Sequence, residues 1–162
     1  MALIPTYSTP IPAFDVLNEL NNIINQINTN FAQQNAPGAA IYAANTATSG
    51  ATAAAASIGG PGVAQAVLDM TGTLGAGANL TLPTAALLAA QIPQLQVGTS
   101  WRLRIINDSS ANFAWTVVAG AGDTLTGTAT IAQNAWRDFL VTCTAVATPA
   151  FTFQGVGTGT NS

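Results

Sequence analysis

Apolar residues recur at helical spacing near the start of the chain. Leu17, Leu20, Ile24, Ile27 and Phe31 are separated by three, four, three and four positions, which is the spacing of a coiled-coil seam. Acidic residues stand at the beginning of this run, where the helix dipole favours them, and a Pro-Gly pair after it is a stop signal. The pattern predicts an amphipathic, coiled-coil-like helix over residues 13–35.

This helix needs burial in order to form. It is rich in asparagine, a mediocre helix former, and has no Glu–Lys pairs to support it, so in isolation it would be marginal. Val16 and Ile23 widen the apolar stripe, and isoleucine at both kinds of core position favours three strands over two. We therefore expect the five seam residues to mediate oligomerisation. Packing of the helix on its own domain is the alternative.

The segments on either side of the helix differ from it in composition. Residues 1–12 contain three prolines among apolar and hydroxyl residues, which favours an extended arm because proline fixes φ and restrains its predecessor. Residues 36–62 are small, neutral and close to low complexity, and they predict a linker.

From residue 63 to residue 158 the pattern changes to short strands and turns. Apolar residues alternate with Arg102 and Arg104 over residues 101–105, which places both arginines on one face of a strand. We expect this strand to form a hairpin with residues 113–118. A short helix is expected over residues 84–91, and further strands over residues 65–71, 79–82, 125–131, 136–146 and 151–156. Strands at this spacing predict an antiparallel β-sandwich or jelly-roll-like domain, followed by a frayed tail at residues 159–162.

Charge is scarce along the whole chain. The 162 residues include three Lys or Arg, six Asp or Glu and no histidine, whereas an average soluble protein of this length would carry roughly 40 charged residues. A surface with so few charged residues suggests that copies of the chain bury part of it against one another. Three cations cannot neutralise a phosphate backbone, so we expect no nucleic-acid binding. We also expect neither a membrane span nor a secretion signal, because no suitable apolar run is present.

Few groups are available for catalysis. Cys143 lies in an apolar alternating run, which predicts a buried structural thiol. Asp123 and Asp138 could in principle act as the carboxylate pair of a glycosidase, but their turn and strand positions favour structural roles, so we expect no enzyme. The sequence holds no metal-ligand cluster or phosphate-binding loop, and no cofactor is expected.

The remaining polar and aromatic candidates point to interfaces or to the core. The three arginines are expected to pair with Asp108, Asp138 or a carboxylate of another subunit; they are Arg102, Arg104 and Arg137. The three tryptophans are expected in the core or at a subunit interface, with a sugar-stacking platform as the alternative; they are Trp101, Trp115 and Trp136.

Two stretches of the β region, QVGTSWRLRIINDSSANFAWTVVAGAG and TLTGTATIAQNAWRDFLVTCTAVATPAFTFQGVGTGT, resemble a Thr/Gly-rich domain of tailed-bacteriophage virion proteins. These are the head-fibre and capsid-decoration, or cement, proteins. The resemblance covers roughly residues 65–160. It implies a short N-terminal segment that grips the capsid, a helical stem and a trimeric β head, in the order in which the arm, the helix and the β region occur here.

The patterns predict a mainly β chain that oligomerises, with three copies favoured. The resemblance implies a homotrimeric structural protein on the capsid exterior of a virion assembled in the host cytoplasm. The resemblance implies that the arm binds the major capsid protein, through Ile4, Pro5, Tyr7, Pro10 and Ile11. The alternative function is a tail fibre that holds a host surface glycan in distal loops at residues 107–112 and 120–123.

Overall fold

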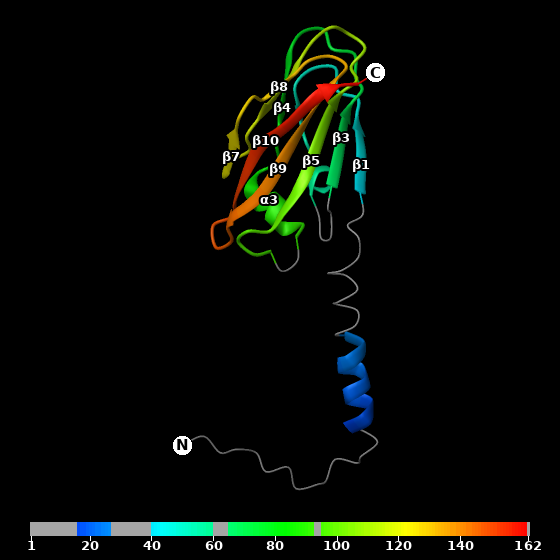
Figure 1. Cartoon of the computed structure of the whole chain (residues 1–162), viewed down its shortest axis with the longest axis vertical. Coiled ribbons are helices and arrows are strands. Elements are labelled where there is room, and N and C mark those ends of the chain that lie inside the picture. Colours follow the sequence, from blue (N-terminus) through cyan, green and yellow to red (C-terminus); the bar gives the residue numbers. More distant parts are fainter. Residues whose placement is uncertain (1–15, 27–39, 60–64, 93–94, 162) are drawn as a thin grey trace. The chain divides into compact units, whose positions relative to one another are not determined.

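The computed structural model describes residues 16–26, 40–59, 65–92 and 95–161. The chain divides into two units, Met1–Ala36 and Pro37–Ser162, drawn in Figure 1. Residues 16–26 of the first unit are helical, which confirms that part of the helix predicted over residues 13–35. The rest of that helix and the predicted arm at residues 1–12 lie outside the described residues.

The second unit is built mainly of strands. Its helices are α2 (Ala55–Ile58) and α3 (Ala85–Ala90). Its strands are β1 (Ala40–Asn45), β2 (Ala51–Thr52), β3 (Gln65–Met70), β4 (Ala78–Thr81), β5 (Ser100–Asn107), β6 (Trp115–Val118), β7 (Asp123–Thr126), β8 (Thr130–Ile131), β9 (Ala135–Ala145) and β10 (Ala150–Thr160).

The strands form two sheets, and the first part of the chain winds between them. The six-stranded sheet has the order β1-β3-β5-β9-β10-β7, and the four-stranded sheet has the order β2-β4-β6-β8. Strands β1, β3 and β5 are parallel neighbours, as are β2, β4 and β6. The chain therefore makes a three-turn coil with one strand of each turn in each sheet. Strands β9 and β10 then form a long antiparallel hairpin beside β5, visible in Figure 1.

A single core lies between the sheets. Leu103, Ile105, Phe139 and Phe153 contribute from the six-stranded sheet, and Trp115 contributes from the four-stranded sheet; all five side chains are fully buried. Alternation along β5 places Trp101, Leu103 and Ile105 in this core and both of its arginines on the opposite face. The prediction that Cys143 is buried is confirmed, since its exposure is 0%.

The expected antiparallel sandwich is only partly right, because both sheets are mixed. The hairpin predicted between residues 101–105 and 113–118 is wrong. Strands β5 and β6 belong to different sheets, so residues 108–114 cross from one sheet to the other. Turn residues between two half-buried strands suit either a hairpin or such a crossing, and local sequence does not separate them.

The β unit also begins earlier than the sequence predicts. Residues 40–58, placed in the expected linker, form β1, β2 and α2. Gly59, in the same expected linker, has no room for a side chain, since a Cβ there would lie 2.9 Å from Trp101 Cζ2. The backbone at Ala47 in turn leaves no room for a side chain at Gly72. Composition typical of a linker is here the composition of close backbone packing.

The predicted short helix is confirmed, whereas two predicted strand boundaries are wrong. The helix expected over residues 84–91 is confirmed as α3, whose N-cap Thr84 accepts a hydrogen bond from the Leu87 amide. The single strand expected over residues 125–131 is two strands, β7 and β8, separated by Gly127 at φ 88°. The tail expected at residues 159–162 is strand through Thr160.

Candidate functional site

The helix of residues 16–26 carries an uncovered apolar stripe. The exposed fractions are 58% for Leu17, 50% for Leu20 and 43% for Ile24, and those of Val16 and Ile23 are 49% and 51%. These are the predicted seam residues and their flanks. The other two seam residues, Ile27 and Phe31, lie outside the described residues. So do all five predicted capsid-binding residues: Ile4, Pro5, Tyr7, Pro10 and Ile11.

The second candidate surface is the side of the six-stranded sheet that faces away from the core. We call it the outer face and define it by one side chain from β1, two from β3, three from β5 and two from β9: Tyr42, Val67, Asp69, Arg102, Arg104, Ile106, Trp136 and Asp138. Tyr42 is 65% exposed. Aromatic residues and arginine are the residue types that protein interfaces favour.

Arg104 and Asp138 form a bidentate ion pair across β5 and β9. The Arg104 Nε and Nη2 atoms donate to Asp138 Oδ1 at 2.7 Å and Oδ2 at 2.9 Å. The hydrogen bonds to Asp138 raise the pKa of Arg104. This confirms one of the predicted arginine–aspartate pairs. Arg102 and Arg137 form no ion pair with a carboxylate of the described residues.

Trp136 stands beside this ion pair with its ring enclosed. The Arg104 guanidinium carbon lies 4.0 Å from the centre of the Trp136 ring, a cation–π contact. On the β10 side the ring lies against glycine, since a Cβ at Gly159 would be 2.6 Å from Trp136 Cζ2. The close approach of the ring to β10 therefore requires glycine at this position.

The tryptophans do not form a sugar-stacking platform. Trp101 and Trp115 are 5% and 0% exposed and lie in the core, as predicted. Trp101 donates its indole hydrogen to the Ile58 carbonyl at 2.7 Å. Trp136 lies on the outer face between Arg104 and glycine. A glycan would therefore find no free pair of ring faces on these three residues.

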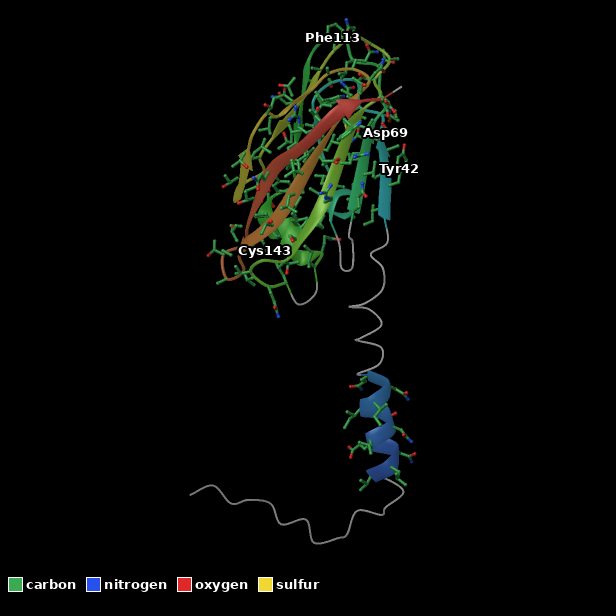
Figure 2. All side chains as sticks on the ribbon, viewed as in Figure 1. Tyr42, Asp69, Phe113 and Cys143 are labelled. Carbon is green, nitrogen blue, oxygen red and sulfur yellow. The ribbon has the colours of Figure 1, made fainter. Side chains whose placement is uncertain are left out.

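Tyr42 and Asp69 form a second polar pair on the outer face. The Tyr42 hydroxyl donates to Asp69 Oδ2 at 2.5 Å, and this hydrogen bond raises the pKa of Tyr42. Figure 2 shows the two side chains at the β1 end of the sheet. Asp69 is only 6% exposed, and its Oδ1 has no hydrogen-bond partner among the described residues. Sequence reasoning misses Tyr42 because residue 42 fell in the expected linker, and the run Ile41-Tyr42-Ala43-Ala44 has no alternation of apolar and polar residues to mark it as a strand.

The two loops proposed for glycan binding lie at opposite ends of the β unit. The loop at residues 107–112 begins at Asn107, the last residue of β5. Asn107 pairs with Ala135, the first residue of β9. Gly122 lies near Pro149, at the far end of the β9–β10 hairpin. Figure 2 shows the same separation through the labels of Phe113 and Cys143. The two loops therefore cannot form a single site.

The first of these loops is held rigidly. Asn107 is fully buried, and its Nδ2 donates to the carbonyl oxygens of Phe113 and Ile131 at 3.0 Å each. Its Oδ1 accepts from the Ser109 hydroxyl at 2.6 Å and from the Ser109 amide at 3.2 Å. Beyond this support Phe113 is 39% exposed. The loop is thus an ordered support for one exposed aromatic ring.

The carboxylates considered for hydrolysis do not come together. Asp138 lies on the outer face in its pair with Arg104, whereas Asp123 is in register with core-facing Phe151. Phe151 pairs with Cys143, so the two aspartates lie roughly 17 Å apart along the strand direction. Burial of both carboxylate oxygens raises the pKa of Asp123 to about 7.

Other chemistry is sparse in the part of the chain that the structure describes. Burial raises the pKa of the Cys143 thiol. No group of three or more His, Cys, Asp or Glu side chains in the described ranges is placed to hold a metal ion. Within the same ranges, no helix has the length and apolar character needed to cross a membrane.

No protein-family model, curated protein or solved structure matches this chain. Three features of the described residues bear on function: the apolar helix stripe, the outer face and the loop at residues 107–113.

Proposed function

We propose that this chain is a structural virion protein of a tailed bacteriophage, a homotrimeric head fibre or capsid-decoration protein attached to the capsid through its N-terminal part. The helix stripe is the observation that carries this proposal. Five large apolar side chains between 43% and 58% exposed on one short helix need a partner, since exposed apolar patches of this kind mark interaction sites. Association of three copies through this stripe supplies that partner.

The arrangement of the β unit supports a role at a distance from the attachment point. Residue 40 begins β1 at the end of the sheet where β5 also begins. The described part of the β unit thus begins at the end of the sheet opposite Asn107. Three capsid-binding arms held in one trimer raise the effective concentration of each arm and turn weak contacts into lasting attachment. Such a role requires no catalysis.

The first test is the mass of the full chain in solution. A trimer has about three times the chain mass of 16.3 kDa, and because burial of apolar surface holds it together, that mass should persist in molar salt. A species of one chain mass at micromolar concentration would overturn the trimer and with it the proposed function.

The second test is deletion of residues 1–12. We expect the variant to remain trimeric and to lose binding to phage particles, whereas the full chain binds them. The helix variant Ile24→Asp serves as the matched control, because it should lose the trimer while keeping the arm. Undiminished binding of the arm-deleted trimer to particles would contradict attachment through the arm.

A tail fibre that contacts a host surface glycan is the second candidate function. The exposed ring of Phe113 on its ordered loop favours it. Phe113→Ala separates the two functions, because loss of host adsorption with normal particle binding supports a receptor-binding fibre. Only the loop at residues 107–113 enters this candidate, since residues 120–123 lie at the other end of the unit.

A further inference from the structure

The outer face of the six-stranded sheet carries four charged side chains whose pairing is incomplete. Asp69 and Asp138 are acidic, and Arg102 and Arg104 are basic, so the face is neutral as a whole. Arg104 and Asp138 satisfy each other. This leaves one negative charge, on Asp69, and one positive charge, on Arg102, with no ion pair between them in the described residues.

These two charges cannot meet within one copy. Asp69 is in register with Ile106, and Arg102 lies four residues earlier on the same strand. At about 3.3 Å per residue, the separation along the strand is roughly 13 Å. An arginine and an aspartate side chain together do not span this distance while lying on a flat sheet. In a ring of copies, Arg102 of one copy can instead meet Asp69 of its neighbour, a heterologous contact in which the two charges lie on different parts of the face.

Tyr42 connects the negative charge of Asp69 to the surface, where a side chain of another copy can reach it. Asp69 is buried beneath the surface, but Tyr42 donates its proton to Asp69 and remains 65% exposed. Because the hydroxyl hydrogen is donated to Asp69, the hydroxyl oxygen remains free to accept a hydrogen bond beside the carboxylate charge. A guanidinium group that approaches this oxygen meets both an acceptor and a negative charge.

We propose that the outer face is the surface through which the β units of neighbouring copies pack, with Arg102 of one copy donating to the Tyr42–Asp69 pair of the next. This inference rests on the homotrimer proposed above and names a contact between its β units. A closed ring of three copies contains three such contacts. Val67, Ile106 and the rim of Trp136 would be covered in the same interface, which accounts for apolar side chains on a face turned away from the core.

Other occupants fit the face less well. Its neutral total charge gives no attraction for a nucleic acid or an anionic membrane. The enclosed ring of Trp136 offers no free aromatic surface to a sugar. Only a copy of this chain is certain to bring both an arginine to Tyr42 and a Tyr42–Asp69 pair to Arg102.

The test is a double-mutant cycle on the full chain, with Tyr42→Phe, Arg102→Gln and the double variant. Tyr42→Phe keeps the ring and removes the hydroxyl, and Arg102→Gln keeps much of the stem and removes the charge. Dissociation of the trimer is followed by sedimentation of labelled protein over a dilution series. Asn79→Ala is the matched control, because residue 79 is exposed on β4, in the four-stranded sheet.

A hydrogen bond to a charged group is worth about tenfold or more in an equilibrium constant. With three contacts per trimer, each single variant should raise the dissociation constant about a thousandfold. The double variant should be no weaker than either single variant, because both remove the same contact. Asn79→Ala should leave the constant unchanged. Arg102→Gln and Asn79→Ala should unfold at the wild-type denaturant concentration when compared as monomers, whereas Tyr42→Phe leaves the buried Asp69 without its hydrogen bond and should unfold at a lower one.

The outcomes separate this contact from the function proposed above. A trimeric wild type whose dissociation constant is unaffected by either substitution would overturn the contact and leave the helix-mediated trimer intact. Effects of the two substitutions that multiply in the double variant would also overturn it, since the residues would then act independently. A wild type of one chain mass at micromolar concentration would overturn the trimer itself.

Discussion

Replacement of Asp123 by asparagine should make the β unit more stable at pH 8 and leave it unchanged near pH 4. Both carboxylate oxygens of Asp123 are buried, and the Phe151 backbone amide offers them only a weak hydrogen bond, which lowers the pKa by less than burial raises it. Burial disfavours the charged form and raises the pKa from 3.8 to about 7. Asparagine keeps the shape of the side chain and cannot ionise.

The folded chain binds the Asp123 proton more tightly than the unfolded chain does, and this difference sets the direction in which the unfolding free energy changes with pH. Between pH 4 and pH 7 the folded chain retains a proton on Asp123 that the unfolded chain releases, so the free energy of unfolding falls as the pH rises through this range. Above pH 7 the penalty is complete. A shift from 3.8 to about 7 corresponds to about 4 kcal/mol in a fully desolvated site. Because Asp123 is only partly shielded from solvent, we expect about 1–2 kcal/mol.

The assay is urea unfolding of the wild type and Asp123→Asn at pH 4, 6 and 8, at one protein concentration, followed by tryptophan fluorescence. Trp101 and Trp115 are buried in the β core and report its unfolding. The difference in unfolding free energy between variant and wild type should grow from near zero at pH 4 to its full value by pH 8. Using the difference removes the contribution of every other carboxylate.

Asp138→Asn is the matched control, because the Asp138 carboxylate forms an ion pair with Arg104, whereas the Asp123 carboxylate forms none with the described residues. It leaves Arg104 without its bidentate acceptor and should destabilise the chain at pH 8 by about 1–3 kcal/mol. An Asp123→Asn variant that is less stable than the wild type at pH 8 would refute the reasoning. So would a stabilisation that is the same at pH 4 and pH 8.

Three further substitutions probe the helix, the loop and the outer face. Ile24→Asp places a carboxylate in the helix stripe and should cost several kcal/mol summed over three copies, seen as a fall in sedimenting mass; an unchanged oligomer would show that the helix is not the stem. Asn107→Ala removes the four hydrogen bonds of the Asn107 side chain and should lower the unfolding free energy by about 2–4 kcal/mol. Its control, Asn112→Ala at an exposed position, should change the unfolding free energy by less than about 0.5 kcal/mol. Gly159→Ala puts a Cβ 2.6 Å from the Trp136 ring and should cost about 1–3 kcal/mol, while Gly75→Ala, with nothing within 4 Å, should be close to neutral. Equal stability of Gly159→Ala and Gly75→Ala would contradict the close packing of Trp136 against β10.

Sequence reasoning predicts those elements whose signals are local. Thr84 as N-cap and the proline at position 93 bound α3, and alternation along β5 correctly places Arg102 and Arg104 on the face away from the core. Both depend on residues a few positions apart. The buried states of Cys143 and Trp115 follow from the same alternation.

The sheet to which each strand belongs is not a local property. Strand β3 pairs with β1 and β5, which lie about 25 residues before it and about 35 after it, as Ala40↔Gln65 and Gln65↔Arg102 show. Parallel pairing of this kind needs a crossover, and here each crossover is a strand of the other sheet. Nothing between residues 107 and 113 distinguishes such a crossing from a tight hairpin. The same non-local pairing brings Tyr42 to Asp69 and Arg104 to Asp138, which is why the outer face could not be assembled from the sequence.

The edge of the six-stranded sheet bears on the same question of assembly. Within the described residues β1 pairs only with β3, so one side of the strand Ala40–Asn45 presents unpaired amides and carbonyls. Proteins protect such edges with charged residues, proline, bulges or very short strands. This strand has six residues, AIYAAN, with no charge and no proline, and pairs with β3 in unbroken register. In a solitary molecule it would be a template for aggregation, whereas packing of neighbouring copies on the adjoining outer face would shield it. The proposed assembly of several copies would account together for three features of the described residues: the unprotected edge of β1, the Asp69 and Arg102 charges without an ion pair, and the exposed helix stripe.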